Sequence, residues 1–132
     1  MAYRRPNWFV RHVFNPIAMK LGLSGVSTLE VPGRRTGASH EVPVIPIEHA
    51  GARYIVSPRG ETEWVRNLRA AGSGELHRKG DVERFDAVEV PAADRPPILE
   101  TYRDVAGRAV KAHFEKLPDP GDHPVFRVEG RA

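Results

Sequence analysis

The spacing of hydrophobic residues along the chain predicts three helices and six strands. Helical spacing appears in residues 6–21, 58–72 and 95–116. Short alternating or β-branched runs appear in residues 26–31, 41–47, 52–57, 74–79, 83–90 and 124–128. Pro16 is expected to kink or split the first helix. Pro43 and Pro46 cannot donate ladder hydrogen bonds, so their segment is expected at a sheet edge or a bulge.

The short connections between neighbouring strands favour mostly antiparallel pairing, because parallel crossovers need about a dozen residues or more. About six strands with helices around them predict an α+β fold that is mainly β. The expected architecture is a small, partly open barrel with flanking helices. The chain has 132 residues, the length of a single domain, so residues 1–132 are expected to form one domain.

Composition narrows the chemistry that is open to the chain. Hydrophobic content of 40% and charged content of 28% are ordinary for a globular domain. The absence of cysteine excludes disulfides and thiolate catalysis, and it agrees with a cytoplasmic location. No run approaches about 18 apolar residues, so no membrane-spanning helix is expected. Six histidines without a ligand spacing such as HExxH predict no metal site.

Two adjacent arginines lie between two glycines in the segment GRRTG, at an expected turn between strands. Arg34 and Arg35 offer planar groups that suit phosphate or carboxylate, and Thr36 adds a hydroxyl. Gly33 and Gly37 let the backbone bend and allow a close approach. The net charge of +3 agrees with an anionic partner. The alternative is a solvated, arginine-rich turn without a ligand.

A second candidate segment follows the strand at residues 52–57. Ser57, Arg59 and Gly60 belong to a loop that leads into the N-terminus of the short helix, where free amides favour electron-rich groups. Trp64 and Asn67 are three residues apart and therefore share one face of that helix. The alternative is that Trp64 packs in the core and Asn67 caps the helix or faces water.

These segments together resemble the deazaflavin-dependent nitroreductase family. The resemblance rests on GRRTG, VPV, YIVSPRG, EWVRNL and HPVFRV in this order, and it covers about residues 28–129. It implies a split β-barrel that binds coenzyme F420, a phosphorylated deazaflavin with a polyglutamate tail. It also implies hydride transfer from the reduced deazaflavin to a small organic acceptor such as a quinone or a nitro compound.

Carried over by position, the resemblance assigns roles to individual residues. The residues that would hold the phosphate and the acidic tail are Arg34, Arg35, Thr36 and Gly37. Val42 and Pro43 would border the ring, whereas Ser57, Arg59 and Gly60 would contact the ring edge or the tail. Trp64 and Asn67 would fix the short helix and the cofactor beside it. Tyr102, on the long helix, is the candidate catalytic proton donor, and its alternative role is a core aromatic.

Other readings of the sequence stay open beside this one. The chain departs from the family where AVKAHFEKL replaces a tyrosine-rich acceptor site. A non-catalytic protein that binds the deazaflavin or FMN is therefore an alternative, and so is FMN as the cofactor. Nucleic acid is not expected as a partner, because charges are mixed and aromatic residues make up 8% of the chain.

The expected N-terminal helix at residues 6–21 has an interfacial composition. Cationic residues at positions 4, 5, 11 and 20 flank aromatic residues at positions 8, 9 and 14. Such a helix is suited to peripheral contact with a membrane surface. The alternative is that it packs over the mouth of the barrel.

Overall fold

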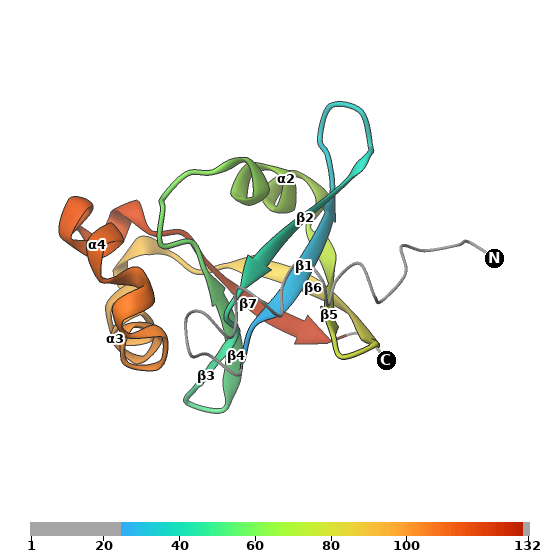
Figure 1. The fold of residues 1–132 in the computed structure, drawn as a ribbon. Coiled ribbons are helices and arrows are strands. Elements are labelled where there is room, and N and C mark those ends of the chain that lie inside the picture. The colour runs from blue at the N-terminus through green and yellow to red at the C-terminus, as the bar shows by residue number, and fades with distance from the viewer. Residues whose placement is uncertain (1–24, 131–132) are drawn as a thin grey trace.

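The computed structural model describes residues 25–130, in which seven strands form one curled sheet (Figure 1). The strands are β1 (Ser27–Pro32), β2 (Ser39–Val44), β3 (Ile47–His49), β4 (Ala52–Val56), β5 (Ser73–Arg78), β6 (Asp81–Glu89) and β7 (Val125–Gly130). Their order in the sheet is β2-β1-β5-β6-β7-β4-β3, and every neighbouring pair is antiparallel. The predicted mainly-β α+β fold, a partly open barrel with flanking helices, is confirmed.

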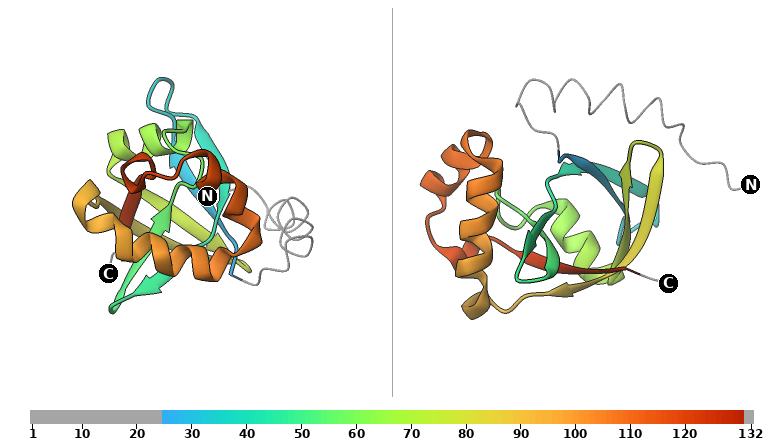
Figure 2. Two further views of the ribbon diagram at one scale, coloured as in Figure 1. Left: turned by 90° about the vertical axis from the view of Figure 1, so that its left-hand side faces the viewer. Right: turned by 90° about the horizontal axis from the view of Figure 1, so that it is seen from below.

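The helices of the described residues lie in two places. Helix α2 (Glu63–Ala71) packs against β1, β5 and β6. Helix α3 (Arg95–Ala106) lies outside the curl of the strands, next to β3 and β4, and helix α4 (Arg108–Lys116) packs against α3 (Figure 2). Two short 3-10 turns are η1 (Ala92–Asp94) and η2 (Pro120–Asp122). The predicted N-terminal helix falls outside the described residues, and none of the described helices is long and apolar enough to cross a membrane.

The two edges of the sheet are formed by consecutive segments of the chain. Only Ile45 and Pro46 separate β2 from β3, yet these strands stand at opposite ends of the sheet order. Three Cα–Cα steps reach at most about 11 Å. The edges therefore lie close together and the sheet must curl. Pro43 and Pro46 lack the N–H groups that would pair one edge with the other, so the barrel stays split.

Two clusters of buried side chains form the core. The first fills the concave side of the sheet and includes Leu29, Phe85 and Phe126, with Val65 and Leu68 of α2 packed against them. The second lies between the outer helices and the sheet and includes Ile98 and Phe114. Val65 and Leu68 are completely buried. Each stabilises the position of α2 by about 1.5–3 kcal/mol of apolar burial.

Two sequence-based expectations about the elements are wrong in detail. The single strand expected at 41–47 is two strands, because the chain crosses between the sheet edges at Ile45 and Pro46. The single helix expected at 95–116 is broken at Gly107, where φ is +58° and ψ is −130°. Val105 precedes the break, in the last turn of α3, and is 50% exposed although the helical spacing placed it on the buried side.

Gly107 provides a test of the helix break. Its backbone conformation is strained for any residue with a Cβ, although nothing else lies close to that position. Gly107→Ala is expected to lower the free energy of unfolding by about 1–3 kcal/mol in urea denaturation. The matched control is Gly25→Ala, which also meets open space but without a positive φ. Equal effects of the two substitutions would show that the helix break carries no backbone strain.

Candidate functional site

A cavity of about 460 Å³ lies between strand β2, the loop after β4 and the N-terminal half of α2. Its volume is typical of a site for a small molecule or cofactor. Six residues of the sequence-predicted site line it: Val42, Pro43, Ser57, Arg59, Trp64 and Asn67. The structure thus brings together three segments that the sequence analysis selected separately.

The arginine hairpin is attached to α2 through Asn67. The backbone N–H of Arg34 donates to Asn67 Oδ1 at 3.1 Å, and Arg34 Nη1 donates to the same oxygen at 2.8 Å. Asn67 is only 2% exposed, so its oxygen has exchanged water for these two donors. The amide therefore neither faces water nor caps the helix. It holds the base of the hairpin against the helix.

Arg34 also forms an ion pair with the first residue of α2. Its Nη1 donates to Glu63 Oε1 at 2.8 Å, and this bond holds the pKa of the Glu63 carboxyl below its usual value. Glu63 is exposed and lines the cavity. The guanidinium of Arg34 is thus occupied by two internal acceptors. Arg35 is exposed, and no hydrogen bond or ion pair from it is found within residues 25–130.

The rest of the hairpin tip builds the turn. The hydroxyl of Thr36 accepts a hydrogen bond from the backbone N–H of Ala38 at 3.2 Å. Gly37 has a φ of +80° and donates to the carbonyl of Gly33 at 2.9 Å. The four residues predicted to hold the phosphate and tail do not line the cavity. They lie in the hairpin that projects beside it (Figure 1): Arg34, Arg35, Thr36 and Gly37.

The loop after β4 is held in place by its own hydrogen bonds. The Ser57 hydroxyl donates to the carbonyl oxygen of Gly60 at 2.6 Å, and Ser57 is fully buried. Gly60, which the sequence analysis placed at the ring or tail, has a φ of +90° and does not line the cavity. A Cβ there would meet Leu117 at 3.2 Å and the carbonyl of Asp122 at 3.3 Å. Ser57 and Gly60 therefore determine the shape of the loop that carries Arg59.

A buried histidine from the far end of the chain supports the same loop. His123 is fully buried, its Nδ1 lies 3.2 Å from the carbonyl oxygen of Ser57, and its Nε2 lies 2.6 Å from that of Leu117. Its ring stacks on Phe114 at 4.1 Å between centroids. Spacing along the sequence gave no sign of this contact. The structure shows His123 joining the pocket loop to the segment that follows α4.

The floor of the cavity is apolar and aromatic. Trp64 is half-buried, and its ring centroid lies 6.2 Å from that of Phe126 in the core. Trp64 also lines the cavity, as do Val42 and the exposed Pro43 on the edge strand β2. Trp64 therefore packs on the core and also borders the cavity, and its contact with a cofactor stays a prediction. An aromatic side chain and apolar edge-strand residues suit a flat conjugated ring.

The N-terminus of α2 points donors at the cavity. Thr62 precedes the helix and makes no capping bond with its side chain, and its buried Oγ1 has no hydrogen-bond partner within residues 25–130. Thr62 lines the cavity. The unpaired N–H groups of the first turn and the helix dipole favour an electron-rich group at the same end. A ligand with a polar edge would satisfy Thr62.

His40 and His113 line the cavity, although the sequence analysis did not select them. No spacing motif could have found His113, because α4 reaches this point only through the tertiary fold. Burial and the nearby cations Arg59 and Lys116 lower the pKa of His113 from its ordinary value of 6.5. The imidazole is therefore neutral at pH 7. It can donate or accept a hydrogen bond without adding charge.

Tyr102 is not brought to this cavity. It is 2% exposed, lies in the second core cluster and packs against Phe114, and burial raises the pKa of its phenol. Its role as a proton donor stays a prediction. A slightly larger cavity of about 480 Å³ lies over α3 and α4 and is lined by Leu99, Arg103 and Phe114 among others. None of the sequence-predicted site residues lines that cavity.

Comparison with known proteins agrees with this geometry. The profile of a family described as F420H(2)-dependent quinone reductase matches residues 2–114. No curated protein matches the chain significantly. An F420-H2 dependent reductase (FDR-A) superposes with a TM-score of 0.64 at 20% identity, covering 80% of this chain and 94% of that one. An F420 reductase gives 0.54 at 13% identity, covering 87% and 93%. A FAD-binding protein from Mesorhizobium loti gives 0.51 at 19% identity, covering 90% of each chain. Identities this low show a shared fold alone.

The attachment of the hairpin through Asn67 can be tested by substitution. Asn67→Ala leaves the Arg34 amide without its acceptor and is expected to lower the free energy of unfolding by about 1–3 kcal/mol. Hydrogen exchange at the Arg34 amide should accelerate by more than the loss of global stability explains. Glu63→Gln is the matched control, because it removes only exposed ion pairs, to Arg34 and Arg66, and should leave the unfolding midpoint nearly unchanged. Slow exchange at Arg34 in Asn67→Ala would contradict the attachment.

The lowered pKa of His113 gives a stability prediction with a definite sign. Above pH 6.5 the imidazole is neutral in both the folded and the unfolded chain and contributes nothing. As the pH falls through 6.5, the unfolded chain takes up the proton first, so the folded state loses stability. Between about pH 7.5 and about pH 5.5, the wild type should lose more stability in urea titrations than His113→Gln. Parallel losses in the two proteins would contradict the shift.

Proposed function

The chain belongs to the F420H(2)-dependent quinone reductase family, and on this basis we propose that the cavity beside α2 binds F420 and that the protein reduces a quinone with it. That the chain is an F420-dependent oxidoreductase follows from the family. What we propose beyond the family is the position of the F420 site and the identity of the acceptor as a quinone. The observation that carries it is the cavity that unites Val42, Pro43, Arg59 and Trp64 with the N-terminus of α2.

The residues present fit the cofactor. The conjugated ring would lie against Trp64 and the edge-strand residues Val42 and Pro43, since these provide the apolar surfaces of the cavity. The polar edge of the ring would meet Thr62, whose buried hydroxyl has no partner within residues 25–130. The anionic tail would lie toward Arg35 at the hairpin. Arg34 and Asn67 hold the hairpin in place and contribute to binding through it.

The protein's own contribution to the reaction is binding, orientation and proton supply. Reduced F420 donates a hydride when it is bound. The apolar walls around Trp64 limit water near the ring. Reduction of a quinone to a hydroquinone also takes up protons, and His113 is the neutral imidazole that faces the same cavity. We therefore assign His113, and not the buried Tyr102, as the residue that relays a proton to the acceptor, with one ring nitrogen taking up a proton from solvent as the other releases one.

The proposal is tested first by binding and then by turnover. Purified protein is titrated with oxidised F420 and, in parallel, with FMN, while ligand fluorescence is followed. Saturable binding of F420 with much weaker binding of FMN is expected. The reduced cofactor is then supplied with a quinone or with a nitroaromatic compound, and faster oxidation by the quinone is expected. Binding of F420 without turnover of any acceptor would support a non-catalytic carrier, and binding of FMN alone would overturn the cofactor assignment.

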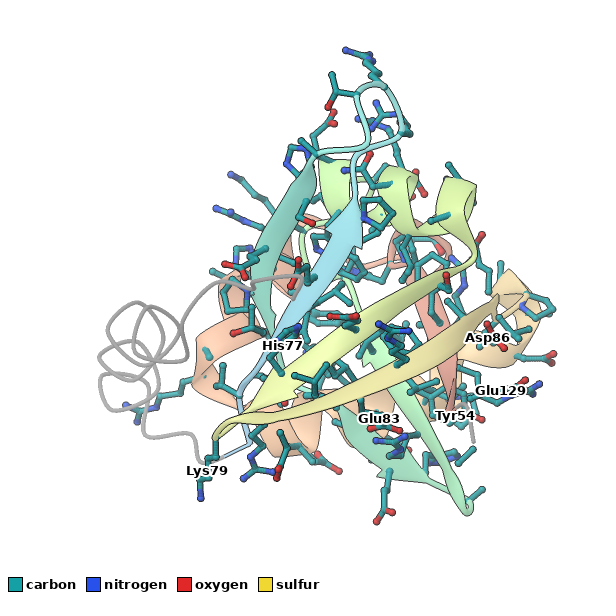
Figure 3. All side chains as sticks on the ribbon, turned by 90° about the vertical axis from the view of Figure 1, so that its right-hand side faces the viewer. Tyr54, His77, Lys79, Glu83, Asp86 and Glu129 are labelled. Carbon is teal, nitrogen blue, oxygen red and sulfur yellow. The ribbon has the colours of Figure 1, made fainter. Side chains whose placement is uncertain are left out.

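The tail-binding role of Arg35 has a matched control on the same molecule. Arg35→Gln is expected to weaken F420 binding by about three- to tenfold at low salt, and less at high salt, because exposed charges are screened. Lys79→Gln removes an equally exposed cation at the tip of the β5–β6 hairpin (Figure 3) and should leave binding unchanged. Equal effects of the two substitutions would show that net charge, and not the hairpin, attracts the cofactor.

A further inference from the structure

We propose a divalent metal site on the outer face of strands β1 and β5, formed by Glu30, Glu75 and His77. The donor atoms of these three side chains all lie within 4.8 Å of one another. The site is separate from the cofactor cavity, which none of the three residues lines. It therefore adds a binding function to the proposed reductase and does not depend on it.

Strand geometry brings the three side chains to one face. Glu30 and Glu75 are directly opposite each other in the antiparallel β1–β5 register, so their side chains point to the same side. His77 follows Glu75 by two residues on β5, and residues two apart on a strand share a face. The intervening Leu76 belongs to the inner core. The three ligands are therefore on the face of the sheet away from α2, where His77 is labelled in Figure 3.

The donor atoms have the separations of ligands around one ion. His77 Nε2 lies 3.1 Å from Glu30 Oε1 and 3.0 Å from Glu75 Oε1. Zinc binds nitrogen and oxygen donors at about 2.0–2.2 Å, which places neighbouring donors about 2.9–3.5 Å apart in octahedral or tetrahedral geometry. An ion can thus enter with small shifts of these side chains. It would replace the hydrogen bond between His77 Nε2 and Glu75 Oε1 and the close contact of the same nitrogen with Glu30 Oε1.

A buried hydroxyl beside His77 is the second, independent observation. Thr28 is opposite His77 in the β1–β5 register, so it faces the same group of side chains. Thr28 is 1% exposed, and its Oγ1 has no hydrogen-bond partner within residues 25–130. A buried hydroxyl without a partner is costly. A metal ion or a water molecule bound to it would give this oxygen a partner.

The surroundings keep the site both acidic and open. His77 is 8% exposed, whereas the side chains of Glu30 and Glu75 retain 21% and 25% exposure, which leaves solvent a path to the carboxylates. Glu41 is opposite Glu30 on β2, so three carboxylates cross neighbouring strands in a row. Arg84 donates to Glu75 Oε2 at 3.3 Å, and Oε1 of the same carboxylate lies beside His77.

The donor set selects the class of ion. One imidazole nitrogen and two carboxylate oxygens suit first-row divalent transition ions such as zinc, manganese or cobalt. Magnesium and calcium prefer oxygen donors alone. Spacing along the chain gave no sign of the site, because the pattern Glu-x-His on β5 becomes a ligand set only when β1 adds Glu30.

The test is metal binding by the full-length chain after treatment with a chelator. Titration calorimetry with zinc should show one ion per chain at this site, and cobalt should give an absorption spectrum of a nitrogen- and oxygen-ligated ion. His77→Gln and Glu75→Gln should each weaken binding about tenfold or more, because each removes a ligand. His49→Gln is the matched control, because His49 lies on β3, away from the site, and is hydrogen-bonded to Thr101 of α3. This variant should bind zinc as the wild type does.

Two results would overturn the proposal. One is the absence of saturable zinc binding by the wild type at micromolar concentrations. The other is zinc binding, or a cobalt spectrum, that persists unchanged in both His77→Gln and Glu75→Gln. Thermal unfolding of each variant without metal confirms that it is folded. Stabilisation by zinc in the wild type and in His49→Gln, but in neither ligand variant, is the expected pattern.

Discussion

The amide oxygen of Asn67 holds together the two elements between which the proposed cofactor site lies. It accepts hydrogen bonds from both the backbone and the side chain of Arg34, and it is almost completely buried. Without it, the projecting hairpin that continues β1 and β2 would have only an exposed ion pair to Glu63 joining it to α2. The cavity between β2 and α2 therefore depends on this side chain, although Asn67 carries no charge and performs no chemistry.

The split in the barrel is what makes the cavity possible. In a closed barrel β2 would pair on both sides, but among the strands of residues 25–130 only β1 pairs with it. The unpaired edge of β2 is thereby free to border a ligand, and Val42 and Pro43 both line the cavity there. Pro43, one of the two prolines at this edge, also supplies an apolar surface to the cavity. The loop after β4 completes the cavity, because Ser57, Gly60 and the buried His123 hold it in position.

Local patterns in the sequence predicted the fold and the elements that carry the site. Alternation and proline positions identified the edge strand, and the resemblance selected six residues that line one cavity. Contacts between individual side chains could not be predicted from the sequence in the same way. Arg34 was expected to bind an anion, but the fold places Glu63 and Asn67 against it. The cavity residue His113 lies far along the sequence from the other lining residues, and only the tertiary fold brings it to them. The same holds for the proposed metal ligands Glu30, Glu75 and His77, which come from two strands. Gly107 breaks a helix that hydrophobic spacing alone predicts to be continuous.

The location of the cofactor is the central claim, and a crystal structure with oxidised F420 tests it most directly. The account predicts the ring between Trp64 and Pro43, its polar edge at Thr62 and the tail directed toward Arg35. Density for the cofactor in the other cavity, over α3 and α4 and against Phe114, would contradict it. That result would leave the family and the fold unchanged. It would require a different function for the arginine hairpin.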